Sequence, residues 1–208
     1  QLELSDLDYQ KQLRRKAEFK ALQSQVNPHF LYNALNTISC VCRENPDRAR
    51  ELILTLSAYY RQTLENDQYM LNLHTELYHV SSYLELEQAR FEEKLQVSMD
   101  VEDDLNCLVP SFILQPLVEN CITHGVANEN GEIAITVSIL WSGGEAPGGI
   151  TIVVHDEGSG DVEAINDHLS GARDLSRDTG GLGIRNVQQR IQLAFGKGYG
   201  LHYRRENG

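Results

Sequence analysis

The stretch that decides the fold is Gln23-Ser-Gln-Val-Asn-Pro-His-Phe-Leu-Tyr-Asn-Ala-Leu-Asn36, with His29 at its centre. Pro28 lacks a backbone N–H and clashes with the preceding helical turn, so we expect a kink or a fresh helix start there. Apolar residues recur on both sides of it at intervals of three and four, the period of one helix face. They are Phe19, Leu22, Val26, Phe30, Ala34, Ile38 and Val41, with Leu31, Leu35 and Cys42 widening the stripe. A stripe this wide indicates a helix bundle rather than a lone surface helix.

A polar stripe follows one edge of that apolar face. Its members are Gln25, His29, Asn33 and Asn36, which are separated by four, four and three residues. Asn33 lies one turn after His29, where it can orient the imidazole ring or hold a water beside it. An Asn that only solvates the edge of a bundle is the alternative interpretation.

The rest of the chain divides into a helical part and an α/β part. Residues 1–26 are expected to form one helix, and helices over residues 47–65 and 75–94 follow. After Leu95 the pattern changes to period two, which predicts strands. The predicted strands cover residues 96–101, 132–139, 150–154 and 200–205, with helices at residues 112–125 and 184–195, a hairpin loop at 143–149 and a polar segment at 161–178.

We therefore predict an α+β fold in three parts. Residues 1–26 would be a helical connector, residues 27–94 a helical hairpin that forms a four-helix bundle in a homodimer, and residues 95–208 an α/β sandwich with a mixed sheet.

Composition excludes several classes of protein. Thirty acidic against 18 basic residues give a formal charge of −12, which argues against a sequence-independent grip on nucleic acid or anionic lipid. The four cysteines lack a C-x-x-C pair and are interpreted as small buried thiols in a reducing compartment. No apolar run is long enough to span a bilayer. The chain begins with Gln inside a helical pattern, so we expect a fragment whose missing N-terminal region anchors it to a membrane.

Three clusters in the second half suit a nucleotide. In Asp156-Glu-Gly-Ser-Gly160 the carboxylate can accept the exocyclic amine of adenine, and Gly158 and Gly160 let the backbone approach a flat base, although the same pattern also occurs as a turn. Gly181 and Gly183 precede a helix whose N-terminus suits phosphate.

The third cluster lies on the predicted helix over residues 112–125. Asn120 and His124 are one turn apart, and they offer an oxygen to Mg²⁺ and a donor to phosphate. A His that satisfies the last carbonyls of a helix is the alternative interpretation of His124.

Taken in order, these motifs resemble the LytS-type sensor histidine kinases of bacterial two-component systems, whose ATP domain belongs to the group that includes gyrase, Hsp90 and MutL. The resemblance runs from about Ala21 to Phe195. Its carriers are Gln25-Val-Asn-Pro-His-Phe-Leu-Tyr-Asn-Ala-Leu-Asn36, Arg90-Phe91, Val109-Pro-Ser-Phe-Ile-Leu-Gln-Pro-Leu-Val-Glu-Asn120 with His124-Gly125, Asp156-Glu-Gly-Ser-Gly160, and Gly181-Leu-Gly-Ile-Arg-Asn186 with Arg190.

The resemblance implies a kinase core on the cytoplasmic side of a membrane protein. It implies that the γ-phosphoryl group of ATP passes to His29 and then to an aspartate on the receiver domain of a response regulator. ATP and Mg²⁺ would be the cofactors, with Asp156 on the adenine amine and Asn120 on the metal. Gly158 and Gly160 would line the base, His124, Gly181 and Gly183 would lie near the phosphates, and residues 161–179 would form a lid.

The match also departs from relatives in ways that bear on the chemistry. Other histidine kinases place an acidic residue directly after the phosphorylated His, whereas this chain has Phe30. Related ATP-hydrolysing proteins carry a Glu one turn before the metal-binding Asn, where this chain has Pro116, and Glu119 lies about 100° away on the helix. We therefore expect phosphotransfer rather than rapid hydrolysis. A response-regulator phosphatase activity supported by Asn33 would come in addition to the kinase activity. A nucleotide-gated interaction module without phosphotransfer is the alternative.

Overall fold

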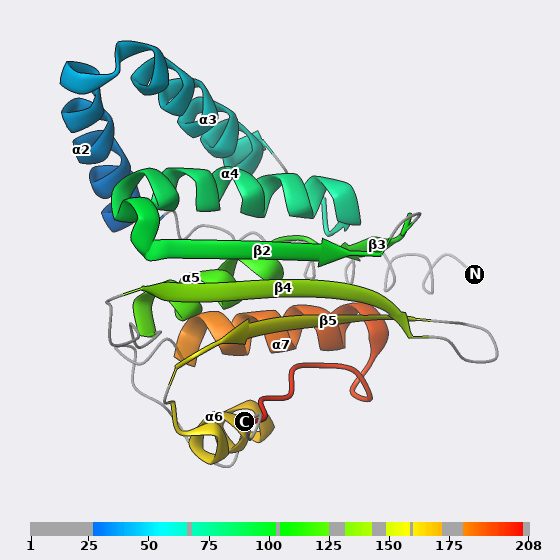
Figure 1. Cartoon of the computed structure of the whole chain (residues 1–208). Coiled ribbons are helices and arrows are strands. Elements are labelled where there is room, and N and C mark those ends of the chain that lie inside the picture. The colour runs from blue at the N-terminus through cyan, green and yellow to red at the C-terminus, as the bar shows by residue number, and fades with distance from the viewer. Residues whose placement is uncertain are drawn as a thin grey trace, which may run out of the picture. The chain divides into compact units, whose positions relative to one another are not determined.

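The computed structural model describes residues 27–65, 68–102, 105–124, 132–142, 149–158, 160–171 and 181–205. Within these residues the fold is α+β, with six α-helices and a mixed three-stranded sheet (Figure 1). The chain divides into two compact units, Gln1–Met70 and Leu71–Gly208. The predicted connector at residues 1–26 lies outside the described residues, and the predicted boundary after residue 94 stays a prediction.

The first unit contains a helical hairpin made of α2 (Pro28–Glu44) and α3 (Pro46–Glu65). The fresh helix start expected at Pro28 is confirmed, because Pro28 is the first residue of α2 and Asn27 caps it. The side chain of Asn27 accepts from the backbone N–H groups of His29 at 3.1 Å and Phe30 at 3.3 Å. The start of the helix thus fixes where His29 lies on it.

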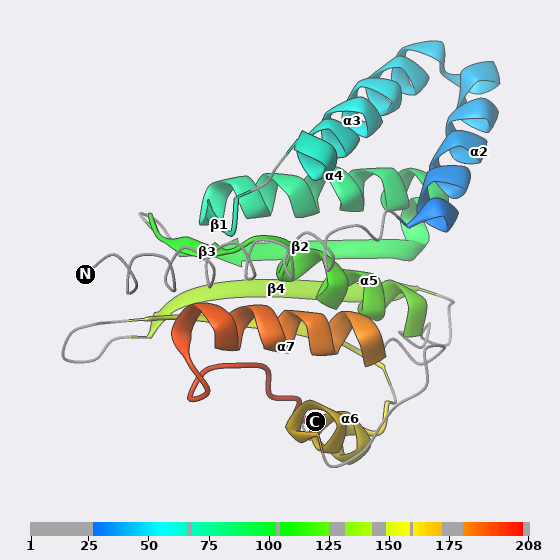
Figure 2. The ribbon, with the colours of Figure 1, turned by 180° about the vertical axis from the view of Figure 1, so that it is seen from behind.

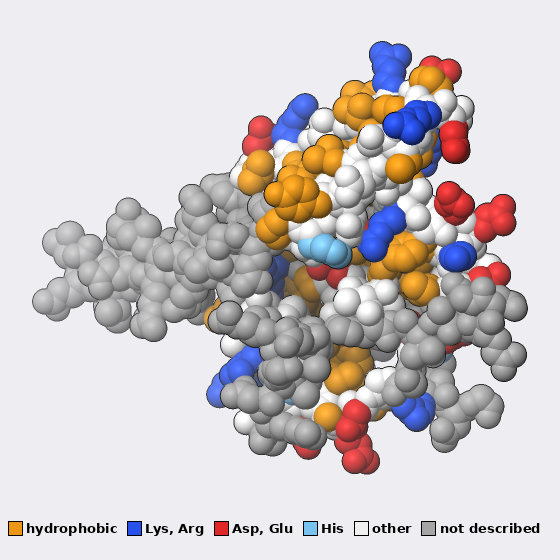
Figure 3. Space-filling view, turned by 90° about the vertical axis from the view of Figure 1, so that its left-hand side faces the viewer, with side chains coloured by type: hydrophobic (Ala, Val, Ile, Leu, Met, Phe, Trp, Pro, Cys, Tyr) orange, Lys and Arg blue, Asp and Glu red, His pale blue; other side chains and the backbone are white. Residues whose placement is uncertain are grey.

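The two helices pack through the predicted apolar stripe. Phe30, Ala34 and Ile38 are buried on α2, and the ring of Phe30 meets that of Tyr59 on α3 edge-on, with centroids 5.1 Å apart. Apolar side chains are visible at the surface in the upper part of Figure 3. Five large apolar side chains of the hairpin are exposed. They are Tyr32, Leu35, Ile53, Leu54 and Leu64.

The second unit holds the sheet. Strand β1 (Met70–Asn72) begins at the boundary between the two units. The elements that follow it in chain order are α4 (Leu73–Phe91), η1 (Glu92–Lys94), β2 (Leu95–Val101), β3 (Leu108–Pro110), α5 (Leu114–His124), β4 (Ile133–Ser142), β5 (Gly149–Asp156), α6 (Val162–Ser170) and α7 (Gly181–Phe195). The sheet has the order β2-β4-β5, with β2 parallel and β5 antiparallel to β4. The short strands β1 and β3 pair separately.

Helices α5 and α7 cover one face of the sheet. They lie behind the strands in Figure 1 and in front of them in Figure 2. Helix α5 packs against α4, α7, β4 and β5, so it is the element through which the layers of this unit meet. Val118 on α5, Val137 on β4 and Val187 on α7 are fully buried in that core.

Two details of the second unit differ from the prediction. Residues 200–205 do not form a strand; instead the Asn166 side chain pairs with the backbone of Tyr203, at 2.8 Å to its carbonyl and 3.0 Å from its N–H. Part of the expected lid is helix α6, which Asp161 caps and which ends at Gly171 in the left-handed conformation. Residues 172–179 of the lid lie outside the described residues.

The cysteines are free thiols, as expected, but only Cys121 is buried. Cys107 is half-buried, and Cys40 and Cys42 are exposed, so the prediction of buried thiols was wrong for those two. Among the described helices, none is long and apolar enough to cross a membrane.

Candidate functional site

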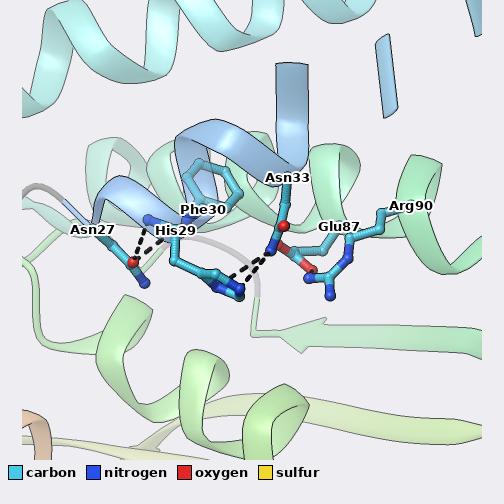
Figure 4. A network of polar contacts seen from close by, with 6 residues as sticks. All are labelled: Asn27, His29, Phe30, Asn33, Glu87 and Arg90. Atoms are coloured by element: carbon cyan, nitrogen blue, oxygen red, sulfur yellow. Dashed lines mark hydrogen bonds and ion pairs between the residues drawn. The ribbon is translucent and has the colours of Figure 1, made fainter. Parts of the chain in front are cut away.

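His29 lies in the first turn of α2 with its imidazole exposed to solvent. The amide nitrogen of Asn33 lies 3.3 Å from Nδ1 of the ring and 3.5 Å from Nε2 (Figure 4). No acidic residue stands in the first turn of this helix. The predicted polar stripe thus brings His29 and Asn33 into contact, while Gln25 lies outside the described residues.

Asp156 ends strand β5, and both of its carboxylate oxygens accept hydrogen bonds. The backbone N–H of Gly158 donates to Oδ1 at 2.6 Å, and the thiol of Cys121 donates to Oδ2 at 3.3 Å. The first bond closes a tight turn of the kind that Asp forms with the residue two positions on. The second comes from α5, so the carboxylate predicted to bind adenine is hydrogen-bonded to the helix that carries Asn120.

Asn120 has a buried amide group. Its Nδ2 atom has no hydrogen-bond partner among the described residues, although buried polar groups in proteins are nearly always paired. Amide oxygen and nitrogen exchange places by a simple flip, so the group can present either to a ligand. An unpaired amide of this kind fits a residue whose partner is a bound ligand.

Magnesium also fits this donor set. Among the described residues, no cluster of three or more His, Cys, Asp and Glu could hold a metal ion. Mg²⁺ in phosphate-transfer sites is commonly held by one or two protein oxygens together with phosphate oxygens and waters. The side-chain oxygen of Asn120 would be the protein ligand here.

Two of the predicted glycines lie next to helices, Gly183 against α5 and Gly160 against α6. A Cβ on Gly183, in the first turn of α7, would lie 3.6 Å from the Cβ of Pro116 on α5. A Cβ on Gly160 would lie 3.8 Å from Ile165. Both are ordinary contacts, so no neighbouring side chain requires glycine at these two positions. The structure therefore brings Gly183 and Asp156 to helix α5, and Gly158 lies next to Asp156. The side chain of His124 lies outside the described residues.

A buried carboxylate fixes the start of α5. Glu76 on α4 is fully buried and accepts from three consecutive backbone N–H groups, those of Phe112 at 2.9 Å, Ile113 at 2.8 Å and Leu114 at 3.0 Å. Burial raises the pKa of Glu76, and the three N–H donors and the charge of Arg190 oppose that rise. The carboxylate thus supplies the acceptors that a helix N-terminus needs.

Arg190 holds the same loop from the other side. Its Nη1 donates to the carbonyls of Ser111 at 2.9 Å and Phe112 at 2.8 Å. Phe112 has a φ of 56°, a left-handed conformation that is strained for a residue with a side chain. Glu76 from α4 and Arg190 from α7 hold this strained residue between them, and α5 begins just beyond it.

A second set of polar residues joins α4 to α5. Burial lowers the pKa of His79 to about 4, opposed by its hydrogen bond with Gln115. The amide of Gln115 donates to Glu119 at 2.7 Å. Burial raises the pKa of Glu119, Gln115 opposes the rise, and the charge of Glu87 adds to it. Glu119 thus takes part in the contact between the two helices, next to Asn120 in the chain.

Glu87 is itself paired. Its carboxylate lies 3.2 Å from Nη1 of Arg90, one turn along α4 (Figure 4). Glu87 is buried, so this pair keeps a charged group of α4 satisfied inside the second unit.

Sequence reasoning missed Glu76, and it gave Cys121 no functional role. Glu76 had a visible signal, because residues 73, 76, 80, 84 and 87 recur at intervals of three and four along α4, and two glutamates occupy positions of that otherwise apolar stripe. A carboxylate at a core position indicates a buried partner. Cys121 had no such signal, since its partner Asp156 is 35 residues away.

Known proteins resemble this chain along nearly its whole length. A family model described as Histidine kinase matches residues 17–95. Sensor histidine kinase YpdA of Escherichia coli is 40% identical over 206 residues, covering 99% of this chain and 35% of that protein. Sensor protein LytS of Bacillus cereus is 40% identical over 208 residues, with 99% and 35% covered. Sensor histidine kinase/phosphatase LytS of Staphylococcus aureus is 38% identical over 206 residues, with 98% and 35% covered.

These matches agree with the family resemblance that the motifs indicated. The chain spans 35% of the length of each of these relatives. It belongs to the LytS-type sensor histidine kinases.

Proposed function

We propose that this chain is the kinase core of a two-component sensor, which transfers the γ-phosphoryl group of ATP to His29 and then to an aspartate on the receiver domain of a response regulator. The observation that carries the proposal is the assembly of Asp156, Asn120 and Gly183 around helix α5. These are the residues that the sequence assigned to adenine, metal and phosphate.

The chain's own residues would bind and orient the nucleotide. Asp156 accepts the exocyclic amine of adenine, and Gly158 and Gly160 line the base. Asn120 holds the magnesium ion, which when bound neutralises charge on the phosphates. His124, Gly181 and Gly183 lie toward the phosphates, where the N-terminus of α7 adds backbone N–H groups.

In the transfer itself, a lone pair on a ring nitrogen of His29 forms a bond to the γ-phosphorus. The bond from that phosphorus to the oxygen it shares with the β-phosphorus breaks, and ADP leaves with the electron pair. Such transfer depends mainly on positioning and on neutralising charge. The exposed position of His29 leaves its ring accessible to this reaction.

Asn33 would set which ring nitrogen reacts. The amide nitrogen of Asn33 lies 3.3 Å from Nδ1 of the ring and 3.5 Å from Nε2. An amide N–H donates, so the ring nitrogen that accepts from it carries the lone pair and the N–H of the neutral ring sits on the other nitrogen. The amide would thereby bias the neutral ring toward one of its two forms.

A phosphatase activity toward the response regulator is a second candidate. The Asn33 side chain next to the ring could position a water for removal of phosphate from the partner. The relative from Staphylococcus aureus is named a sensor histidine kinase/phosphatase. Loss of dephosphorylation with retained labelling of His29 in an Asn33→Ala variant is the expected signature.

We further propose that the chain works as a homodimer on the cytoplasmic side of a membrane protein. The exposed apolar side chains on the helical hairpin, such as Leu54 and Leu64, suit a four-helix bundle made with a second copy. A membrane anchor would lie in a part of the protein that precedes this chain.

The experiment is incubation with magnesium and ATP labelled on the γ-phosphate. Wild type should acquire a label that acid removes and base does not, and both His29→Gln and Asp156→Asn should stay unlabelled. Label that survives in His29→Gln would contradict the proposal.

Two other outcomes would point to other functions. If wild type binds ATP but forms no phosphohistidine, and Asp156→Asn abolishes the binding, the results would favour a nucleotide-gated interaction module. Phosphate release that His29→Gln does not change would favour a hydrolytic ATPase.

A further inference from the structure

Asp156 is held at both carboxylate oxygens, and the two donors differ in origin. The N–H of Gly158 comes from the chain just after β5, and any residue but proline has this backbone donor. The thiol of Cys121 comes from α5, 35 residues earlier in the chain. Only this second bond depends on the identity of a side chain. It therefore ties the orientation of the carboxylate to the helix that carries Asn120.

We propose that Cys121 is a positioning residue for adenine: its thiol fixes Asp156 in the orientation that accepts the exocyclic amine, and it thereby sets the preference for adenine over guanine nucleotides. The proposal rests on the proposed role of Asp156 in ATP binding. An ionised carboxylate offers about four acceptor sites, so two stay available after the bonds to Gly158 and Cys121 are made.

Cys121 is shielded from solvent and faces the carboxylate. The residue is 5% exposed, and its Sγ lies 3.3 Å from Oδ2 of Asp156. An ionised carboxylate only accepts hydrogen bonds, so the thiol is the donor in this contact.

Without the thiol, Asp156 keeps only its bond to Gly158 and gains freedom to rotate about its side-chain bonds. The amine of adenine then meets a less well-placed acceptor. Guanine has a carbonyl oxygen at the same position, which a carboxylate repels, so the discrimination between the two bases depends on that placement.

The test is a set of binding titrations on the 208-residue chain with magnesium present. The ligands are ATP, GTP and purine riboside triphosphate, which is ATP without the exocyclic amine. The variants are Cys121→Ala, Cys121→Ser, Asp156→Asn and, as a matched cysteine control in the same unit, Cys107→Ala. A thiol and a hydroxyl are similar in size and both donate, so the Ser variant tests for rescue.

Cys121→Ala is expected to weaken ATP binding about five-fold, the net value of one hydrogen bond, and to leave binding of purine riboside triphosphate unchanged. Cys121→Ser should bind ATP as wild type does, and Cys107→Ala should match wild type with all three ligands. Equal weakening of ATP and of the analogue in Cys121→Ala would overturn the inference, because it would indicate a general packing defect. Unchanged binding of ATP would overturn it as well.

Asp156→Asn separates this inference from the proposed function. If that variant loses ATP binding while Cys121→Ala keeps it in full, the proposed function stands and the inference fails. If Asp156→Asn binds ATP as tightly as wild type, the proposed adenine site is wrong, and the inference fails with it.

Discussion

Around His29, the contacts come from residues two to four positions away, whereas the second unit holds its site with residues far apart in the chain. Asn27 and Asn33 reach His29 and its helix turn along α2 itself. By contrast, Glu76 binds N–H groups 36–38 positions away, and Arg190 reaches carbonyls 78 and 79 positions away. One region depends on a single helix turn, and the other depends on the fold of a whole unit.

This difference has a functional meaning. In the function proposed above, His29 must be reached by two other groups in turn, the nucleotide and the response regulator, and an exposed ring on one helix turn allows both. A nucleotide site must instead hold a ligand in one geometry, and rigid support from several elements achieves that. Substitutions should therefore cost much more stability in the second region than in the first.

The largest effect is expected for Glu76→Ala. Three backbone N–H groups and Arg190 would lose the buried carboxylate, which costs about 3–5 kcal/mol of the free energy of unfolding. Urea unfolding of wild type and variant, followed by circular dichroism, measures the difference. Glu93→Ala is the control, since Glu93 is exposed in η1. A loss below about 1 kcal/mol would show that the start of α5 does not depend on Glu76.

The next effect concerns pH and His79. Its pKa is about 4 in the folded state and about 6.5 in the unfolded chain, so between these values the unfolded state binds the extra proton. Stability from this group is fully present above pH 6.5 and is lost as the pH falls toward 4. From pH 7 to pH 5 the loss is about 2 kcal/mol.

Unfolding of wild type and His79→Gln at both pH values tests this point. The quantity to compare is the loss of unfolding free energy of each protein on acidification. The variant is needed as a reference because the raised pKa of Glu119 makes its own contribution to stability grow as the pH falls. The variant should lose about 2 kcal/mol less than wild type on acidification. His74→Gln is the control, because His74 is exposed on the same helix. Identical pH slopes in His79→Gln and wild type would refute the assignment of a neutral buried His79.

A smaller effect is expected in the first region for Asn27→Ala. The two N–H groups of His29 and Phe30 would lose their cap, which costs about 1 kcal/mol. Thermal unfolding of the helical hairpin within the chain measures it. Asn36→Ala changes the same residue type in the middle of α2 and should cause no loss. If Asn27→Ala and wild type had the same melting temperature, the Asn27 cap would not stabilise the start of α2.

The smallest effect on stability is expected for Asn33→Ala, within about 0.5 kcal/mol, because its side-chain amide bonds to an exposed ring. The same substitution should change the balance between the two neutral forms of the His29 ring, which nitrogen chemical shifts report. Unchanged shifts would mean that Asn33 does not orient the ring.

The difference between the regions also explains what sequence could predict. Spacing along one helix placed His29, Asn33 and the helix start at Pro28, because those relations are local. Strands β2, β4 and β5 followed from their period of two. Helix α6 was not predicted, because its sequence is polar and its cap and its left-handed Gly171 are weak signals in a loop-like composition.

The second region needed more than spacing. Asp156, Asn120 and Gly183 were placed in one site by their order along the chain and by the family resemblance, and periodicity alone would not have joined them. The bond from Cys121 to Asp156 and the bond from Phe112 to Glu76 join residues that are far apart in the chain and meet only in the folded unit. The predicted strand at residues 200–205 failed for the same reason, because Asn166 on α6 takes the place of a neighbouring strand.

The most direct test is to locate the phosphoryl group by mass spectrometry after the chain has been incubated with magnesium and ATP. We expect the modified residue to be His29, in wild type and in Cys107→Ala, and we expect no modification in Asp156→Asn. A phosphoryl group on another residue, or an unmodified His29 in a chain that binds ATP, would contradict this expectation.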